Sequence, residues 1–161
     1  MTKKIILIGS LVGSLDALAA VINAYFSFGL MPYRVFQYIA SGLLGQKAYQ
    51  SQTLPVSLGV IIHFSIAITV TYIFYQAYKR FGKASTPKFL LGSMYGIGIW
   101  LVMNYIVIPF SLIGTYPKNP IQIVIGLLIH IFVIGIPIEV LIRRIVKKME
   151  NSIGVKYPRE A

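Results

Sequence analysis

Four long apolar stretches dominate the sequence and leave few alternatives for its fold. They cover residues 5–28, 54–78, 89–109 and 120–142. Each has about 20 residues or more, which at about 1.5 Å per residue of α-helix is enough to cross roughly 30 Å of hydrocarbon. Because backbone polar groups must pair internally in lipid, each stretch is expected to form a helix. The chain is therefore predicted to be an all-α, polytopic membrane protein, a four-transmembrane-helix bundle.

Composition supports a single membrane domain over residues 1–161. Apolar residues make up 57% of the chain, charged residues 12%, and the mean hydropathy is +0.76. Ordinary soluble domains are less apolar. The chain contains no cysteine, which excludes disulfides, thiolate metal sites and cysteine nucleophiles. Asp16 interrupts the first apolar run just before Ala17-Leu18-Ala19, so we interpret this run as a retained helix and not as a cleaved signal peptide.

The positive charges are divided unevenly between the loops. Twelve lysines and arginines fall at the two termini and in the loop of residues 79–88, whereas three, Arg34, Lys47 and Lys118, fall on the other side. The positive-inside rule then predicts that both termini are cytoplasmic, and that this basic face meets anionic lipid. Since the charges follow topology and do not gather on one surface, we predict no nucleic-acid partner.

The two longest segments outside the predicted spans are residues 30–53 and 143–161. Residues 30–53 carry apolar side chains near helical spacing, interrupted at Ser41-Gly42 and at Gly45, which predicts a short external helix that caps the bundle. Residues 143–161 are basic and polar, and we predict a cytoplasmic tail that frays beyond Lys148. In the fourth span, Gly135-Ile136-Pro137 predicts a kink, because proline removes a backbone donor and clashes with the preceding turn.

The two halves of the chain share short glycine motifs. Residues 9–13 and 92–96 both read GSxxG, and residues 59–63 and 126–130 both read GxxxH. This pattern indicates two similar helical hairpins, and because each has two spans the copies would run in the same direction, as a parallel repeat. Small units of this kind also allow a homo-oligomer.

Each predicted span carries one strongly polar side chain at membrane depth: Asp16, His63, Asn104 and His130. Such groups are costly in hydrocarbon and face the bundle interior, so these four residues are the candidates for a ligand site or a proton or ion pathway. Helical periodicity places each in a stripe of small residues, and the stripes are predicted to converge on one axis. Glu139 is less informative, because Arg143 follows one turn later as an ordinary i,i+4 pair.

Several interpretations of this polar core stay open. We predict a non-enzymatic membrane protein that binds or conducts a proton, ion or small solute without a cofactor. A first alternative is a b-type haem with His63 and His130 as axial ligands. A second is a metal-dependent enzyme that holds zinc or iron with Asp16, His63 and His130. The four residues would otherwise serve only as hydrogen-bonding contacts between helices.

Short runs along most of the chain carry a resemblance to known proteins. They are QYIASGLLG at residues 37–45, Gly59 with His63-Phe64, Met103-Asn104-Tyr105 before Pro109, and His130 before Gly135-Ile136-Pro137. On these runs the chain resembles a group of small bacterial four-span inner-membrane proteins that has no established activity. The resemblance implies a bacterial inner-membrane location and assigns no substrate or site residue.

Overall fold

The computed structural model describes residues 2–82 and 86–153, and every regular element in these ranges is a helix. Four continuous helical spans are long and apolar enough to cross a membrane: Thr2–Phe28, Thr53–Phe81, Leu90–Phe110 and Pro120–Asn151. The predicted all-α class with four apolar helices is confirmed. In chain order the elements are α1 (Thr2–Phe28), α2 (Pro32–Leu44), a 3₁₀ turn η1 (Gly45–Tyr49), α3 (Thr53–Phe81), α4 (Leu90–Val102), a π-turn η2 (Met103–Val107), α5 (Ile108–Phe110), α6 (Pro120–Ile129), a π-turn η3 (His130–Gly135) and α7 (Ile136–Ile153).

The surface of the four spans is rich in large apolar side chains. Leu7, Ile61, Val102 and Phe132, one from each span, are all exposed. A surface of this kind is costly in water, whereas in a bilayer it meets lipid chains of the same character. The four helices are therefore compatible with a helical membrane bundle.

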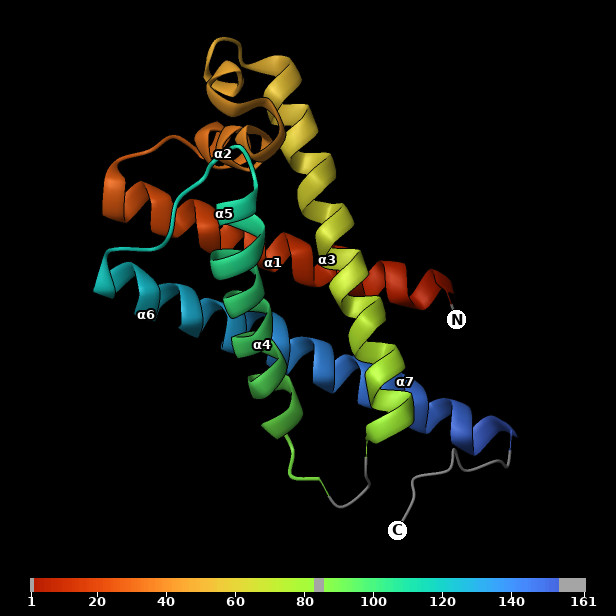
Figure 1. The fold of residues 1–161 in the computed structure, drawn as a ribbon. Coiled ribbons are helices and arrows are strands. Elements are labelled where there is room, and N and C mark those ends of the chain that lie inside the picture. Colours follow the sequence, from red (N-terminus) through yellow and green to blue (C-terminus); the bar gives the residue numbers. More distant parts are fainter. Residues whose placement is uncertain (1, 83–85, 154–161) are drawn as a thin grey trace.

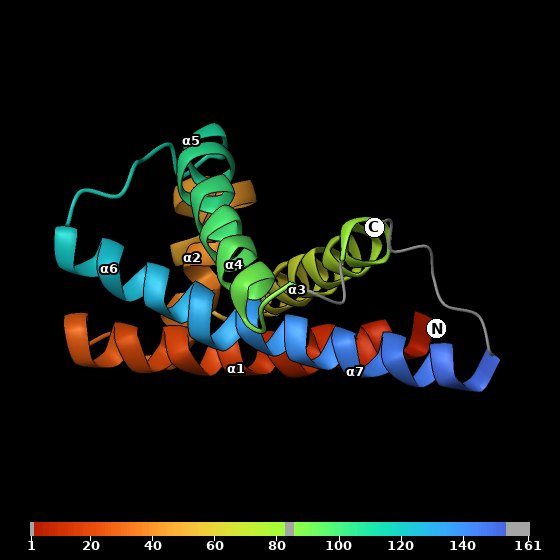
Figure 2. The same cartoon turned by 90° about the horizontal axis from the view of Figure 1, so that it is seen from below.

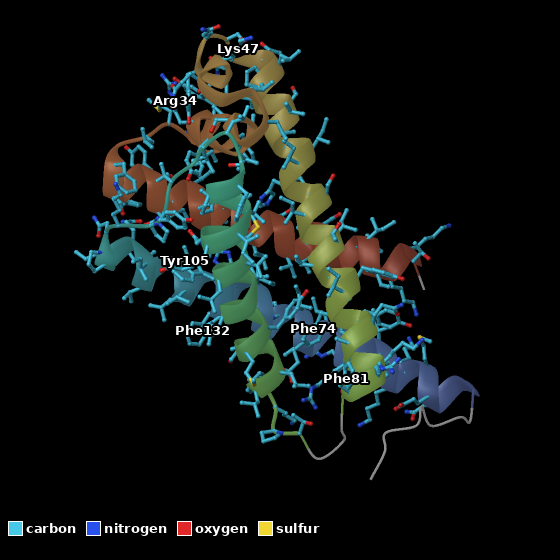
Figure 3. The ribbon with its side chains drawn as sticks, viewed as in Figure 1. Arg34, Lys47, Phe74, Phe81, Tyr105 and Phe132 are labelled. Atoms are coloured by element: carbon cyan, nitrogen blue, oxygen red, sulfur yellow. The ribbon has the colours of Figure 1, made fainter. Side chains whose placement is uncertain are left out.

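The spans cross one another at steep angles. α1 lies beside the fourth span (α6, η3 and α7) and runs in the opposite direction, as Figure 2 shows, while α3 and α4 cross this pair (Figure 1). α1 packs on α3 and on the fourth span, and α4 packs on η3. The N-terminus and the end of α3 lie toward one end of the bundle, and α2 lies at the other (Figure 1). Arg34 and Lys47 mark the α2 end, and Phe81 marks the opposite one (Figure 3).

The buried apolar core occupies the half of the bundle away from α2. Its members come from the first half of α1, the last half of α3, and the region from η3 into α7, with Ile99 from α4. The most deeply buried residues are Ile138 and Ile142 of α7, whose side chains have no exposed surface. Packing is therefore tightest near the end that carries the N-terminus, and looser beneath α2.

Glycines set two close helix crossings, of α1 with α3 and of α4 with η3. A Cβ atom at Gly9 would lie 2.7 Å from the Cα of Ile68 on α3. On the other crossing, a Cβ at Gly96 would overlap the carbonyl oxygen of His130, and one at Gly135 would overlap that of Gly92. Both GSxxG motifs thus face a neighbouring helix, as their small side chains predicted.

The glycines of the two GxxxH motifs behave differently from each other. Gly59 lies against the backbone carbonyl of Phe36 in α2, whereas Gly126 lies against the indole of Trp100 in α4. In both halves of the chain, the GSxxG glycines therefore contact a neighbouring helix in a similar way, whereas the GxxxH glycines contact different kinds of group. A duplicated origin of the two hairpins stays a prediction.

α2 and η1 form the predicted cap over the α2 end of the bundle. α2 runs without a break from Pro32 to Leu44, so the predicted interruption at Ser41-Gly42 is wrong. The helix ends at Gly45, whose φ of +56° suits glycine better than any other residue. The backbone N–H of Leu112 donates to the carbonyl of Gly42 (3.0 Å), which ties the cap to the α5–α6 connection.

The fourth span differs from the prediction at its end and in its middle. α7 continues to Ile153, so the first part of the predicted tail, from residue 143, is helical, and residues 154–161 of that tail lie outside the described part. The predicted distortion before Pro137 takes the form of η3, in which the N–H of Ile136 donates to the carbonyl five residues back, on Ile131. A π-turn is one of the known ways in which a helix adapts to a following proline.

Candidate functional site

A cavity of about 250 Å³ lies between the helices beneath α2. Three of the four predicted polar residues line it: Asp16 from α1, His63 from α3 and His130 from η3. Tyr38 of the cap also contributes, and the rest of the wall is apolar, with contributions from all four spans. The predicted convergence of the polar stripes therefore holds for three spans, in a space large enough for a small solute or several waters.

His63 is held by a backbone group of the neighbouring helix. Its Nε2 lies 2.8 Å from the carbonyl oxygen of Gly13. Because a carbonyl can only accept, Nε2 carries the hydrogen and donates it. Phe36 and Phe64 contact the ring edge-on, at 6.3 and 5.3 Å between ring centroids. The ring is therefore fixed, and Nδ1 is the nitrogen left to accept a proton or a ligand.

His130 is held within its own helix. Its Nδ1 donates to the carbonyl of Gly126, one turn earlier, at 2.8 Å. The other nitrogen, Nε2, is consequently the one available for a proton or a ligand. The backbone at this point is also constrained, since the carbonyl of His130 lies against Gly96 of α4. The two histidines thus present opposite ring nitrogens.

Asp16 supplies the acidic group of the cavity. It follows Gly13 by three residues, so its side chain lies on the same face of α1 as the carbonyl that holds His63. The carboxyl lines the same cavity as both imidazoles. This carboxyl accepts no hydrogen bond from a side chain or backbone group of the described residues. Its oxygens are therefore free to bind a proton, a water or a cation in the cavity.

Asn104 lies apart from this group. It sits in η2, half-buried, and its Nδ2 donates to the carbonyl of Trp100 on the preceding turn (2.9 Å). It does not belong to the cavity wall. The structure therefore gives Asn104 a local backbone contact and leaves a site of three residues.

The two cofactor alternatives fit this geometry poorly. Within residues 2–82 and 86–153, no three histidine, cysteine, aspartate or glutamate side chains lie close enough to hold a metal ion together. The predicted ligand set of Asp16, His63 and His130 is therefore not formed as a metal site. A haem would need both histidine rings free to face one porphyrin, whereas Nε2 of His63 is turned to the carbonyl of Gly13.

Polar side chains continue from the cavity toward the α2 end of the bundle. Asn23, two turns beyond Asp16 on α1, donates from Nδ2 to Oε1 of Gln122 on α6 (2.9 Å). Ser27, one turn further, donates to Oδ1 of Asn23 (3.0 Å). These residues form a polar ladder between α1 and α6, a feature that is costly on a lipid-facing surface and suits a hydrated path.

The opposite side of the cavity is closed by apolar residues. Val12, Ile99 and Ile134 line the cavity and also belong to the buried core that fills the half of the bundle away from α2. The glycine crossings of α1 with α3 and of α4 with η3 also bring the backbones of these helices close together. The cavity therefore borders polar side chains on the side toward α2 and the packed apolar core on the opposite side.

Glu139, which the sequence pattern marked only as half of an i,i+4 pair, is fully buried. Its Oε2 accepts the backbone N–H of Gly92 in the first turn of α4, and its Oε1 binds Nε of Arg143 at 2.6 Å. A carboxylate at a helix amino end satisfies a donor that has no partner within the helix and complements the helix dipole. Glu139 therefore joins α7 to the start of α4, and the only sequence signal for it was an acidic residue beside an apolar run.

No family model, curated protein or solved structure matches this chain. The interpretation of the site accordingly rests on its geometry. The resemblance to small bacterial four-span proteins stays a prediction.

Proposed function

We propose that this protein is a non-enzymatic membrane protein whose central cavity binds a proton or a small cationic solute through Asp16, His63 and His130. One observation carries the proposal. A carboxyl with no recorded donor shares an otherwise largely apolar cavity with two imidazoles, each of which has one nitrogen held by a backbone carbonyl and one nitrogen free. Groups arranged in this way exchange protons without changing their positions.

The surroundings of the cavity favour binding from the α2 end. Asn23, Gln122 and Ser27 provide hydrogen-bonding groups along that route, while the apolar core blocks the other direction. A solute that enters would replace water at Asp16 and would have its charge balanced by the carboxylate. Conduction across the whole bundle would in addition require the apolar half to open.

The distribution of charge supports an orientation for this site. The positive-inside rule assigns the basic end, with both termini, to the cytoplasm, and so assigns α2 and the polar ladder to the outer side. For a bacterial protein this is the periplasmic side of the inner membrane. The site would then sample protons or solutes from outside the cell.

The chain has two histidines, which makes a direct test practical. In lipid nanodiscs, the ring signals of ¹³C-histidine are followed by NMR against pH and assigned with His63→Gln. We expect the His130 ring to exchange protons with solvent, and Asp16→Asn to change the pH dependence of its signals, because the carboxyl and this ring line the same cavity. Asn104→Ser, outside the cavity wall, serves as the control and should leave the His130 signals unchanged.

The same variants separate the proposal from a purely structural role. If neither ring titrates in a folded protein, or if Asp16→Asn leaves both curves as they were, the polar groups only join helices. Proton flux into dye-loaded proteoliposomes then decides between binding and conduction. A flux that Asp16→Asn abolishes and Asn104→Ser preserves would extend the proposal from binding to conduction.

A further inference from the structure

A second cavity, of about 650 Å³, lies at the end of the bundle away from α2. Its wall is built from Tyr78 near the end of α3, from the turn just before α4, and from α7 between its first turn and Asn151. Four basic side chains line it, Lys88, Arg143, Arg144 and Lys147, against two carboxylates, Glu139 and Glu150. The lining therefore has a net charge of +2 and is suited to an anion.

Arg143, one of the four basic residues, already has protein partners. Arg143 donates from Nε to Glu139 and from Nη2 to the carbonyls of Thr86 and Pro87, both at 3.3 Å, and its guanidinium lies over the ring of Tyr78. These contacts fix the wall of the cavity. Lys88, Arg144 and Lys147 are exposed and form no ion pair with a described residue, so their charge is available to a ligand.

The surface beside these cations is apolar. Phe81, Phe89 and Leu90 are exposed at the helix ends that border the cavity, and Met94 continues this surface one turn further along α4 with 61% of its area exposed. Basic groups next to an exposed apolar helix face match the two parts of a phospholipid, a charged headgroup and acyl chains. A soluble phosphate compound would use only the basic part.

We propose that this cavity binds the phosphate headgroup of an anionic phospholipid, with the acyl chains along the exposed face of α4. Lys88, Arg144 and Lys147 contact the phosphate. The first turn of α4 does not, because Glu139 already occupies the N–H of Gly92. This site is independent of the Asp16 cavity, and neither proposal requires the other.

The test uses the full chain purified in an uncharged maltoside detergent. Native mass spectrometry measures retention of phosphatidylglycerol against phosphatidylcholine, and glycerol 3-phosphate is titrated as the soluble source of the same phosphate chemistry. The variant Arg144→Gln/Lys147→Gln removes two cavity charges. Lys3→Gln/Lys4→Gln removes two exposed charges from α1, outside the cavity, and is the matched control.

We expect saturable binding of phosphatidylglycerol that falls about tenfold in the Arg144/Lys147 variant and stays within about twofold in the Lys3/Lys4 control, as loss of local headgroup contacts predicts. Equal binding of glycerol 3-phosphate and of the lipid would overturn the assignment to a phospholipid. Equal losses in the two variants would show a response to overall charge only, and would overturn the site itself.

Discussion

Replacing Gly96 with alanine should open the crossing between α4 and η3. A Cβ at this position would overlap the carbonyl oxygen of His130 and would lie 2.8 Å from its carbon and 2.9 Å from the Cα of Ile131. Ordinary contact of a Cβ begins at 3.4 Å, so the helices must separate by about 0.5 Å or more, the difference between 3.4 and 2.9 Å. All three atoms belong to the backbone and cannot rotate away.

Gly98→Ala provides the matched control, since a Cβ there meets no atom within 4 Å. Alanine favours a helix over glycine by up to about 1 kcal/mol at either position, and this gain cancels when the two variants are compared. The remaining difference is the cost of overpacking, about 1–3 kcal/mol. For a difference of about 2 kcal/mol, we expect Gly96→Ala to melt about 4–8 °C below Gly98→Ala.

The assay is the loss of the monodisperse peak in size-exclusion chromatography after heating in mild detergent, measured side by side for the wild type and both variants. Equal melting of Gly96→Ala and Gly98→Ala would refute the close crossing. A Gly96→Ala variant more stable than Gly98→Ala would also refute the close crossing, because the higher helix propensity of alanine would then outweigh any cost of overpacking.

Two further predictions concern the basic end and the orientation of the chain. Glu139→Gln should lower the free energy of unfolding in detergent by about 2–4 kcal/mol, because it weakens the hydrogen bond to the N–H of Gly92 and leaves the charge of Arg143 uncompensated. Adding Arg143→Met should recover part of this loss. Equal losses in the single and double variants would refute the coupling between the two residues. Since the chain has no cysteine, Lys47→Cys and Lys148→Cys can be labelled individually with a membrane-impermeant maleimide in intact cells. Lys47→Cys should react directly and Lys148→Cys only after permeabilisation, and the reverse pattern would invert the proposed orientation.

The sequence predicted the four spans well because apolar length is a local property. It placed their starts within a few residues but ended the fourth span too early, at residue 142, because hydropathy measures the membrane-buried length and not the helix length. Beyond that point arginine, lysine and glutamate are good helix formers, and α7 continues to Ile153. The cap shows the converse error. Ser41-Gly42 has low helix propensity, yet Ser41 is buried and its Oγ bonds to the carbonyl of Tyr38.

Three of the polar residues that line the cavity were predictable because helical periodicity, like apolar length, is a local property. Asp16, His63 and His130 were found because a polar residue in a stripe of small ones faces protein. The stripe that ended in Asn104 assumed regular α-helical periodicity, whereas η2 begins at Met103 and changes that periodicity. Glu139 was missed because its local partner, Arg143, seemed sufficient. Its second partner, Gly92, is 47 residues away in the sequence, and no local pattern reveals such a contact.

The two π-turns precede Pro109 in the third span and Pro137 in the fourth in the same way. Ile108, before Pro109, donates to Met103, and Ile136, before Pro137, donates to Ile131, five residues back in each case. Proline has no N–H, so the regular pattern of i to i−4 backbone hydrogen bonds is interrupted at these points. The residue before each proline instead donates its N–H to the carbonyl five residues back, which widens the turn.

In the fourth span this wider turn determines which side chains share a face. His130 and Ile138 are eight residues apart, which in a regular helix rotates one side chain by about 80° from the other. A π-turn absorbs one residue and removes about 100° of rotation, leaving a difference of about 20°. His130 therefore lines the polar cavity while Ile138 fills the apolar core on nearly the same face. Relaxation of η3 to a regular α-helix would turn His130 away from Asp16 if α7 stayed in place. The polar site and the packed half of the bundle are consequently coupled through a single turn.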